Sequence, residues 1–194
     1  MAKAQEQPLR AAAGAVCCRA HQPAQPTRAE GRHILMVNLA DAKASNCTAN
    51  LTGKHALCVG GSSGCGKGAA LVLSRQGCAV TIIGRDEERG RLAAEEISAA
   101  SPTGLKCDFI SCDVRQFSSI KAVCEKYTNG GQRASLDFLT LSCTRGGIQG
   151  FRPTAEGYDE RLMTMYLARF GFVHALIPLL LKSEGARVIS IVRK

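Results

Sequence analysis

Short apolar runs alternate with stretches of helical periodicity along residues 54–192. Short apolar runs next to turn residues are typical of buried parallel strands, and apolar residues spaced three and four apart are typical of amphipathic helices. The runs predict strands at 56–59, 79–83, 105–111, 136–141 and 186–192. The periodic stretches predict helices at 69–75 and 85–99, a helix around 120–127, and a long helix at 158–182.

Strands that alternate with helices form a parallel sheet with right-handed crossovers. We therefore expect an α/β fold, a Rossmann-like doubly wound parallel sheet of about five strands in the order 3-2-1-4-5, over residues 51–194. A ligand should bind at the carboxyl ends of the first and fourth strands, where the strand order reverses. The residues expected to face inward from the long helix are Leu162, Met165, Tyr166, Val173, Leu176, Ile177 and Leu180.

A glycine-rich turn joins the first strand to the first helix. A diphosphate needs backbone N–H groups, no β-carbons in its path and the positive end of a helix dipole. Gly60 suits a sharp turn, Gly64 lets the main chain approach a pyrophosphate, and Gly66 lets the helix lie close to the strand. The alternative is a purely structural turn. The nucleotide-binding residues predicted here are Gly60, Ser62, Ser63, Gly64, Cys65 and Gly66.

The spacing of these glycines points to a known family. Three residues separate Gly60 from Gly64 and one separates Gly64 from Gly66, an order that resembles the T-G-x-x-x-G-x-G turn of short-chain dehydrogenases/reductases, with Val59 in place of threonine. The resemblance extends over residues 54–192. It implies an oxidoreductase that transfers hydride between a nicotinamide dinucleotide and a small carbonyl or alcohol substrate.

Arg85 stands nineteen positions after Gly66, at the end of the second predicted strand, where a ribose-selecting side chain belongs. A guanidinium there can bind a 2′-phosphate in bidentate fashion, which favours NADP over NAD. Lys67 could contribute, whereas Asp86 could repel the same phosphate. Asp113 resembles the family's aspartate that contacts the adenine amino group, and its alternative role is a helix cap.

The later part of the chain departs from the family pattern. Where the family reads N-N-A-G after the fourth strand, this chain reads Leu-Ser-Cys-Thr at 141–144. Met165 occupies the position of the family's catalytic asparagine, and Val192 and Arg193 occupy those of its paired serines. None of the three tyrosines is followed by lysine four positions later, so the Y-x-x-x-K segment is absent from a sequence that ends at Lys194.

These departures leave three interpretations open. The first is an NADP-dependent oxidoreductase fold, incomplete at its carboxyl end, that retains dinucleotide binding but has little or no activity. The second is a non-catalytic nucleotide-binding or interaction module. The third is an unrelated kinase-like phosphate-binding domain, which is disfavoured because Lys67-Gly68 lacks the hydroxyl that follows lysine in a P-loop.

The composition of the chain limits the classes of partner that it is expected to bind. The chain has 194 residues and a net charge of +9, but no dense Lys/Arg block, so nucleic-acid binding is not expected. Ten cysteines without a C-x-x-C pair indicate a reducing compartment rather than disulfides or metal ligands. No apolar run approaches the roughly 20 residues that a membrane span needs. An exposed edge at the fifth strand predicts a marginally stable or aggregation-prone protein. A homo-oligomer is a further expected state.

Residues 1–50 show no sustained periodicity and are rich in Ala, Gln, Pro and Arg. This composition predicts a disordered tail. Because basic residues outnumber acidic ones before residue 36, a mitochondrial or other organelle-targeting segment at 1–35 is an alternative to a cytoplasmic location.

Overall fold

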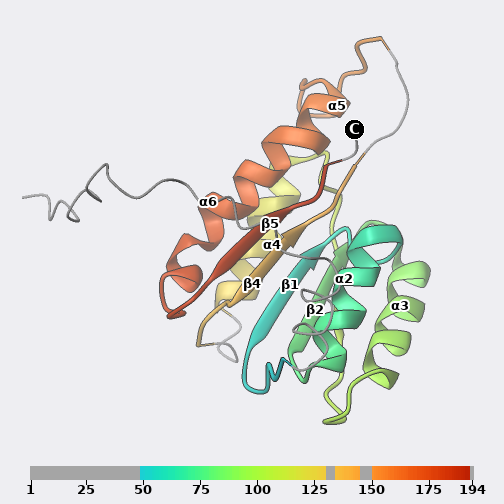
Figure 1. The fold of residues 1–194 in the computed structure, drawn as a ribbon. Coiled ribbons are helices and arrows are strands. Elements are labelled where there is room, and N and C mark those ends of the chain that lie inside the picture. Colours follow the sequence, from blue (N-terminus) through green and yellow to red (C-terminus); the bar gives the residue numbers. More distant parts are fainter. Residues whose placement is uncertain (1–48, 130–133, 145–149, 193–194) are drawn as a thin grey trace, which may run out of the picture. The chain divides into compact units, whose positions relative to one another are not determined.

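The computed structural model describes residues 49–129, 134–144 and 150–192. The tail and the targeting segment expected at 1–50 lie outside these residues, apart from 49 and 50. Within the described residues the elements follow one another as strand and helix alternately, as the hydrophobic pattern predicts. Figure 1 shows their arrangement along the chain.

The sheet is parallel throughout and its strand order is β3-β2-β1-β4-β5. This confirms the predicted Rossmann-like fold and strand order. The strands are β1 (His55–Val59), β2 (Ala79–Gly84), β3 (Asp108–Ser111), β4 (Phe138–Leu141) and β5 (Arg187–Ser190). The helical elements are α2 (Gly64–Arg75), α3 (Glu87–Ala99), α4 (Phe117–Asn129), α5 (Glu160–Leu162), the π-helix η1 (Met163–Leu167) and α6 (Ala168–Leu180).

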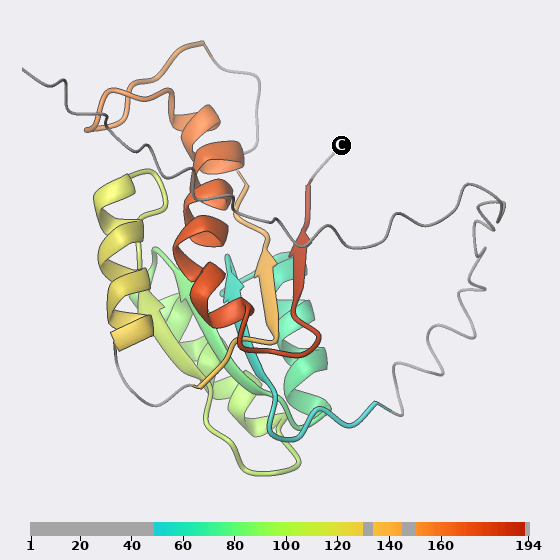
Figure 2. The same cartoon turned by 90° about the vertical axis from the view of Figure 1, so that its left-hand side faces the viewer.

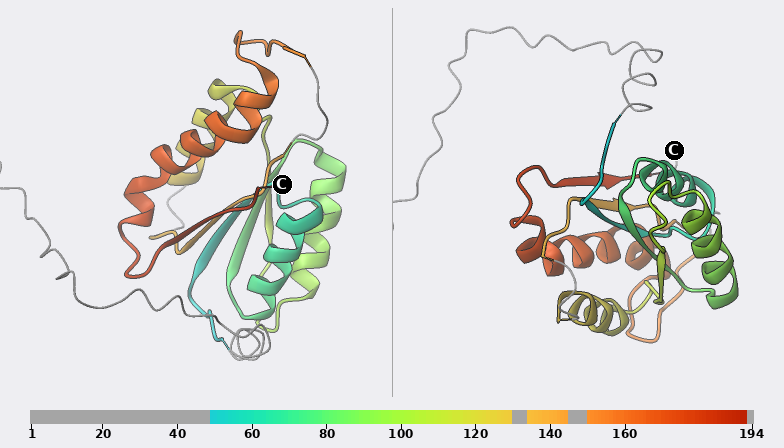
Figure 3. Two further views of the ribbon diagram at one scale, coloured as in Figure 1. Left: turned by 45° about the horizontal axis from the view of Figure 1, so that its top comes forward. Right: turned by 90° about the horizontal axis from the view of Figure 1, so that it is seen from below.

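Helices cover both faces of the sheet, as Figures 1 and 2 show. Along β1, Ala56 and Cys58 pack toward α2 and α3, whereas Leu57 and Val59 join the cluster formed with α4 and α6. This alternation follows from the two-residue period of a strand. Each face of the sheet thus carries one hydrophobic cluster, and the residues at the centre of each cluster, such as Ile82, are completely buried. The left view of Figure 3 shows the two helical layers flanking the sheet.

Most element boundaries differ from the prediction by one to five residues, and two of these differences have a clear cause in the structure. β3 begins at Asp108 rather than at residue 105, because Leu105 is exposed and the backbone N–H of Cys107 donates to Ser98 Oγ instead of joining the sheet. The long helix begins at Glu160, because the Asp159 side chain accepts from the N–H groups of Arg161 and Leu162 and caps it.

The inward face predicted for the long helix is partly wrong. Leu162, Tyr166 and Ile177 are exposed, whereas Leu176 and Leu180 are buried as expected. The residues that are actually buried there are Glu160, Met163, Thr164, Ala168, Arg169, Phe172, Leu176, Leu179 and Leu180. Apolar side chains project from nearly every side of α6. The spacing of its apolar residues therefore does not show which face of the helix packs into the core. The π-helical turn then shifts the register of the residues before it.

The segment Glu160–Leu180 has the length and composition of a membrane-spanning helix, with a mean hydropathy of 1.4. Polar residues scattered along its first half make this run inconspicuous in the sequence, so no membrane span was predicted there. Core helices of soluble proteins have the same properties, and Phe172 and Leu176 of this helix are completely buried in the core. The helix is therefore a core element of the α/β fold.

A buried carboxylate joins the elements at the amino ends of the strands. Asp137 accepts from Lys54 Nζ at 3.0 Å, the backbone N–H of His55 at 2.9 Å and Ser183 Oγ at 2.7 Å. Burial acts to raise the pKa of Asp137, but the bonds from Ser183, His55 and Lys54 outweigh it and hold the pKa below its ordinary value. The carboxylate thus links β1, β4 and the turn before β5.

We expect Asp137→Asn to lower the free energy of unfolding by about 2 kcal/mol at pH 7, because the charge-assisted bonds to Asp137 are lost. The folded pKa lies below the unfolded value of about 3.9, so the carboxylate stabilises the fold above that pH and loses its effect as pH falls further. Urea unfolding at pH 7 and pH 3 should show the two proteins converging in acid. A difference that stays constant between these pH values would contradict the assignment.

Candidate functional site

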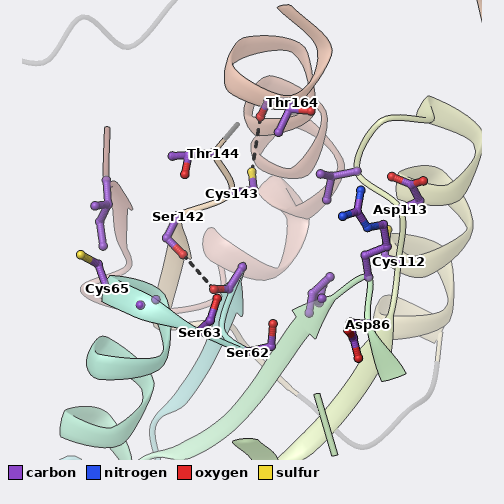
Figure 4. Close-up of a pocket in the computed structure, with 18 of the residues that line it drawn as sticks. Ser62, Ser63, Cys65, Asp86, Cys112, Asp113, Ser142, Cys143, Thr144 and Thr164 are labelled. Carbon is purple, nitrogen blue, oxygen red and sulfur yellow. Dashed lines mark hydrogen bonds between the residues drawn. The ribbon is translucent and has the colours of Figure 1, made fainter. Parts of the chain in front are cut away.

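A cavity of about 660 Å³ lies at the carboxyl ends of β1, β2, β3 and β4. This is where a doubly wound sheet places its ligand. The structure brings every site residue predicted from the sequence to the wall of this one cavity. These residues are Gly60, Ser62, Ser63, Gly64, Cys65, Gly66, Arg85 and Asp113. Figure 4 shows several of them around the space between the strand ends and the first turn of α2.

The glycine turn has the backbone geometry that the prediction requires. Gly60 and Gly64 have φ values of +81° and +56°, which side-chain-bearing residues rarely adopt. A Cβ on Gly60 would lie 2.8 Å from Ser142 Oγ and 2.9 Å from the Cys143 backbone nitrogen. Ser63 is the N-cap of α2, but its side chain makes no capping hydrogen bond. The first N–H groups of α2 therefore face the cavity without a side-chain cap.

Ser142, at the end of β4, holds the turn in place. Its hydroxyl lies 3.0 Å from the carbonyl oxygen of Val59 and 3.2 Å from that of Gly60 (Figure 4). Its backbone N–H also donates to the Val59 carbonyl. Ser142 is the second residue of the segment 141–144, which departs from the family's N-N-A-G pattern. The structure shows that this serine joins β4 to the glycine turn.

Two arginines line the end of the cavity next to β2. Arg85 follows β2 directly, and Arg89 lies in the first turn of α3. Asp86 does not stand alone between them: its Oδ1 accepts from the Arg89 backbone N–H at 2.9 Å, and its Oδ2 lies 3.4 Å from Arg89 Nη2. Asp86 is therefore the N-cap of α3 and is paired with a cation. The sequence analysis missed Arg89, although a basic residue three positions after an N-cap aspartate was a usable signal.

Lys67 does not take part in this site. Its ammonium group forms an ion pair with Glu96 of α3, and Lys67 is not among the residues that line the cavity. In this arrangement nothing supports the suggestion that Lys67 contributes to a phosphate site. A basic residue at the fourth position of a helix already lies beyond the first exposed N–H groups, and here its long side chain turns toward the neighbouring helix.

Asp113, at the end of β3, is held by Arg115. The Arg115 Nε lies 2.9 Å from Oδ1 and 3.0 Å from Oδ2, and Nη2 lies 2.6 Å from Oδ2. These bonds keep the pKa of Asp113 below its ordinary value. Asp113 does not cap α4, because Glu156 accepts from the first N–H groups of that helix, at Phe117 and Ser118. Asp113 does accept from the backbone N–H of Arg115, so it caps the turn that precedes α4 rather than α4 itself.

Arg115 also connects β3 to the long helix. Its Nη1 lies 3.1 Å from Oε1 of Glu160, the first residue of α5. Arg115 and Glu160 both line the cavity, and Glu160 is 9% exposed. They lie 45 positions apart in the sequence, so no local spacing could have revealed the contact.

Three thiols line the cavity, at Cys65, Cys112 and Cys143. Burial raises the pKa of Cys112 to about 12 and also raises the pKa of Cys143, so both remain neutral thiols. Cys143 Sγ lies 3.5 Å from the carbonyl oxygen of Thr164 (Figure 4). Cys65 is exposed in the first turn of α2. Cys112 and Cys143 therefore serve as packing groups beneath the cavity.

A buried arginine fixes the strand ends that flank the cavity. Arg169 is 8% exposed, and its Nη1 lies 2.7 Å from the Leu141 carbonyl oxygen and 2.6 Å from Ser190 Oγ. Its Nη2 lies 2.8 Å from the carbonyl oxygen of Cys143 and 2.9 Å from that of Ile191. One guanidinium thereby joins β4 and β5 at the edge of the sheet that carries the cavity.

A parallel sheet of this order, with a glycine turn opening into a cavity at its carboxyl edge, defines a Rossmann-type α/β domain. A family model described as "short chain dehydrogenase" matches residues 54–193. The chain belongs to the short-chain dehydrogenase/reductase family, whose members are oxidoreductases.

Several relatives and solved structures are similar to this chain. It is 37% identical over 161 residues to Oxidoreductase AN1596 of Emericella nidulans, covering 80% of this chain and 47% of that protein. It is 29% identical over 160 residues to human Dehydrogenase/reductase SDR family member 13, covering 82% of this chain and 41% of that protein. The chain thus spans about half the length of the curated relatives it matches.

Two solved structures share the fold. One is a metagenomic short-chain oxidoreductase in complex with NADP, with a TM-score of 0.63, 23% identity, and coverage of 74% of this chain and 64% of that one. The other is the Pseudomonas aeruginosa RhlG/NADP active-site complex, with a TM-score of 0.60, 26% identity, and coverage of 73% and 55%. The first similarity concerns the fold alone.

Proposed function

We propose that this chain binds NADP(H) in the cavity at the carboxyl ends of β1, β2, β3 and β4, and that it forms the nucleotide-binding part of an oxidoreductase that acts on a carbonyl or alcohol. The observation that carries the proposal is the uncapped start of α2 beneath a turn in which a Cβ at Gly60 or Gly66 would collide with neighbouring atoms. The backbone N–H groups of Gly64, Cys65 and Gly66 would hold the pyrophosphate. The Ser62 and Ser63 hydroxyls would add donors.

The form of the nucleotide follows from the two arginines next to β2. Arg85 is exposed at the cavity wall, and Arg89 is oriented by its pairing with Asp86. Guanidinium groups bind a phosphate through charge-assisted, bidentate hydrogen bonds. Because the Asp86 carboxylate is already engaged, its charge is offset, and the pair would favour the 2′-phosphate of NADP over the 2′-hydroxyl of NAD.

Isothermal titration calorimetry on the purified 194-residue chain tests both parts of the proposal. We expect NADPH to bind more tightly than NADH. The variant Arg85→Gln should weaken NADPH binding by about tenfold or more, because a charge-assisted contact with phosphate is lost. The affinity of the same variant for NADH should change by less than about threefold.

A matched control is Arg75→Gln, an exposed arginine in the last turn of α2 that does not line the cavity. It should leave the affinity for both nucleotides unchanged. Equal losses of NADPH and NADH affinity in Arg85→Gln would refute the selective role of this arginine. No heat of binding from either nucleotide at millimolar concentration would refute the function itself.

Nucleotide binding without turnover is the second candidate function. It is favoured by Met165, which stands where the family's catalytic asparagine is expected, is half-buried and is not among the residues lining the cavity. In addition, neither Tyr158 nor Tyr166 has a lysine four positions later. Oxidation of NADPH by the purified chain in the presence of a panel of ketones and aldehydes separates the candidates. Measurable turnover would exclude the binding-only function.

A further inference from the structure

Residues 152–159 form a surface hairpin that precedes α5. The backbone N–H of Thr154 donates to the carbonyl oxygen of Tyr158 at 2.7 Å, and that of Gly157 donates to the carbonyl oxygen of Thr154 at 2.9 Å. Gly157 has a φ of +81°, the left-handed conformation that closes a three-residue hairpin loop. These features give the tip of the hairpin, which carries Glu156, a defined conformation.

Glu156 caps α4 from this tip. Its Oε2 accepts from the Phe117 N–H at 2.6 Å, and its Oε1 accepts from the Ser118 N–H at 3.0 Å and the Ser118 hydroxyl at 2.6 Å. The first turn of α4 has no acidic residue of its own, so the hairpin supplies the negative charge that a helix start favours. The rings of Phe117 and Tyr158 also meet edge to face, 6.0 Å apart. Figure 2 shows the segment before α5 reaching over the amino end of α4.

The other end of the hairpin leads directly into the cavity wall. Asp159 caps α5, and Oε1 of the next residue, Glu160, lies 3.1 Å from Arg115 Nη1. Arg115 in turn donates to Asp113. The side chains of Glu160, Arg115 and Asp113 line the cavity, whereas that of Glu156 does not. The hairpin therefore links the start of α4 to the Asp113 end of the cavity.

Little else holds the hairpin on the domain. Between residues 150 and 158 every residue except Thr154 is exposed. A surface segment that buries so little apolar area opens locally at a low cost in free energy. A ligand shifts such an equilibrium toward the state that it binds more tightly. A nucleotide in the cavity meets the wall formed by Arg115 and Glu160 only when the start of α5 is in place, so it favours the docked hairpin.

We propose that Glu156 is a positioning residue for the nucleotide site: the hairpin that it docks on α4 holds Glu160 against Arg115, so that hairpin docking and NADP(H) binding favour each other. This inference rests on the proposed binding of NADP(H). Glu156 acts through the cavity wall and does not contact the ligand. The coupling is reciprocal, so the nucleotide stabilises the docked hairpin by the factor by which docking strengthens nucleotide binding.

Hydrogen exchange of the full chain, measured with and without NADPH, reports the docking directly. Glu156 protects the amides of Phe117 and Ser118, and saturating NADPH should slow their exchange about fivefold. Glu156→Ala should speed the exchange of both amides and weaken NADPH binding about fivefold in calorimetry. The matched control is Glu125→Ala, which removes an exposed carboxylate further along α4 that pairs with Lys121. It should change neither quantity.

A double variant separates positioning from the stability of α4. Gln116 directly precedes the first residue of α4, and Gln116→Asp gives the helix a cap of its own. When Gln116→Asp is combined with Glu156→Ala, the midpoint of thermal unfolding should return toward the wild-type value, whereas NADPH binding should stay weakened. Recovery of affinity together with stability would mean that Glu156 only stabilises α4, and it would overturn the inference.

The remaining outcomes separate this inference from the proposed function. Exchange at Phe117 and Ser118 that NADPH leaves unchanged would overturn the inference, and so would wild-type affinity in Glu156→Ala. Both results would leave NADP(H) binding intact. If the wild type binds no nucleotide, the proposed function fails and the inference fails with it. The exchange comparison with and without NADPH uses the wild-type chain alone, so poor folding of a variant would not prevent a decision.

Discussion

Replacing Gly66 by alanine should weaken NADPH binding by about 100-fold or more and destabilise the fold by about 2–3 kcal/mol. A Cβ at this position would collide with Ser142 Oγ and with the carbonyl oxygen of Gly60. The carbonyl belongs to the main chain of the turn, and the serine is bonded to that same turn. Neither group can move without displacing the cradle proposed for the pyrophosphate.

The control for this variant is a glycine two positions further along α2. Gly68 is exposed, and a Cβ there would meet no atom within 4 Å. Gly68→Ala should stabilise the protein by about 0.5–1 kcal/mol, because alanine favours a helix interior over glycine. Calorimetry and thermal unfolding of both variants make the comparison. Wild-type binding by Gly66→Ala would show that the turn does not form the pyrophosphate cradle.

Replacing Arg169 by methionine is the second change with a large expected effect. The guanidinium donates to four oxygen atoms at the ends of β4 and β5, and methionine would leave these acceptors without their donors. Unpaired buried acceptors and the lost charged donor should together cost about 3 kcal/mol. For a domain of this size we expect the midpoint of thermal unfolding to fall by about 10 °C.

Arg169→Lys should recover only part of this loss, because an ammonium group has three donors on one atom and cannot span acceptors on two strands. Arg161→Met provides the control: Arg161 is an exposed arginine at the start of the same helical segment, and its replacement should change the midpoint by no more than about 2 °C. A midpoint for Arg169→Met within that control range would mean that the strand ends hold together without the guanidinium.

The fold and the glycine turn could be predicted from the sequence because each depends on local signals. The apolar runs alternate with helical stretches, and this alternation alone determines a parallel sheet with crossovers. The spacing of Gly60, Gly64 and Gly66 is likewise local, since the glycines lie between a strand and a helix. Arg85 was identified because a strand end at a known distance from the turn specifies its place in the cavity.

The remaining parts of the site depend on contacts between distant segments. Arg115 and Glu160 meet only after β3 and the long helix have packed, and Arg169 reaches β4 and β5 from the interior. Thr164 lines the cavity from a π-helical turn, which a regular period of 3.6 residues does not represent. Some residues that replace those of the family pattern make contacts of their own in this chain, as Ser142 does with the glycine turn.

The position of Asp86 constrains any redesign of nucleotide preference. A common strategy for converting an NADP-binding protein to NAD would place a new carboxylate beside the ribose and remove the arginines. In this chain the existing carboxylate already begins α3 through the Arg89 backbone N–H and orients the Arg89 side chain. Altering the pair for selectivity would therefore loosen a helix of the scaffold, so Arg85 is the safer residue to exchange.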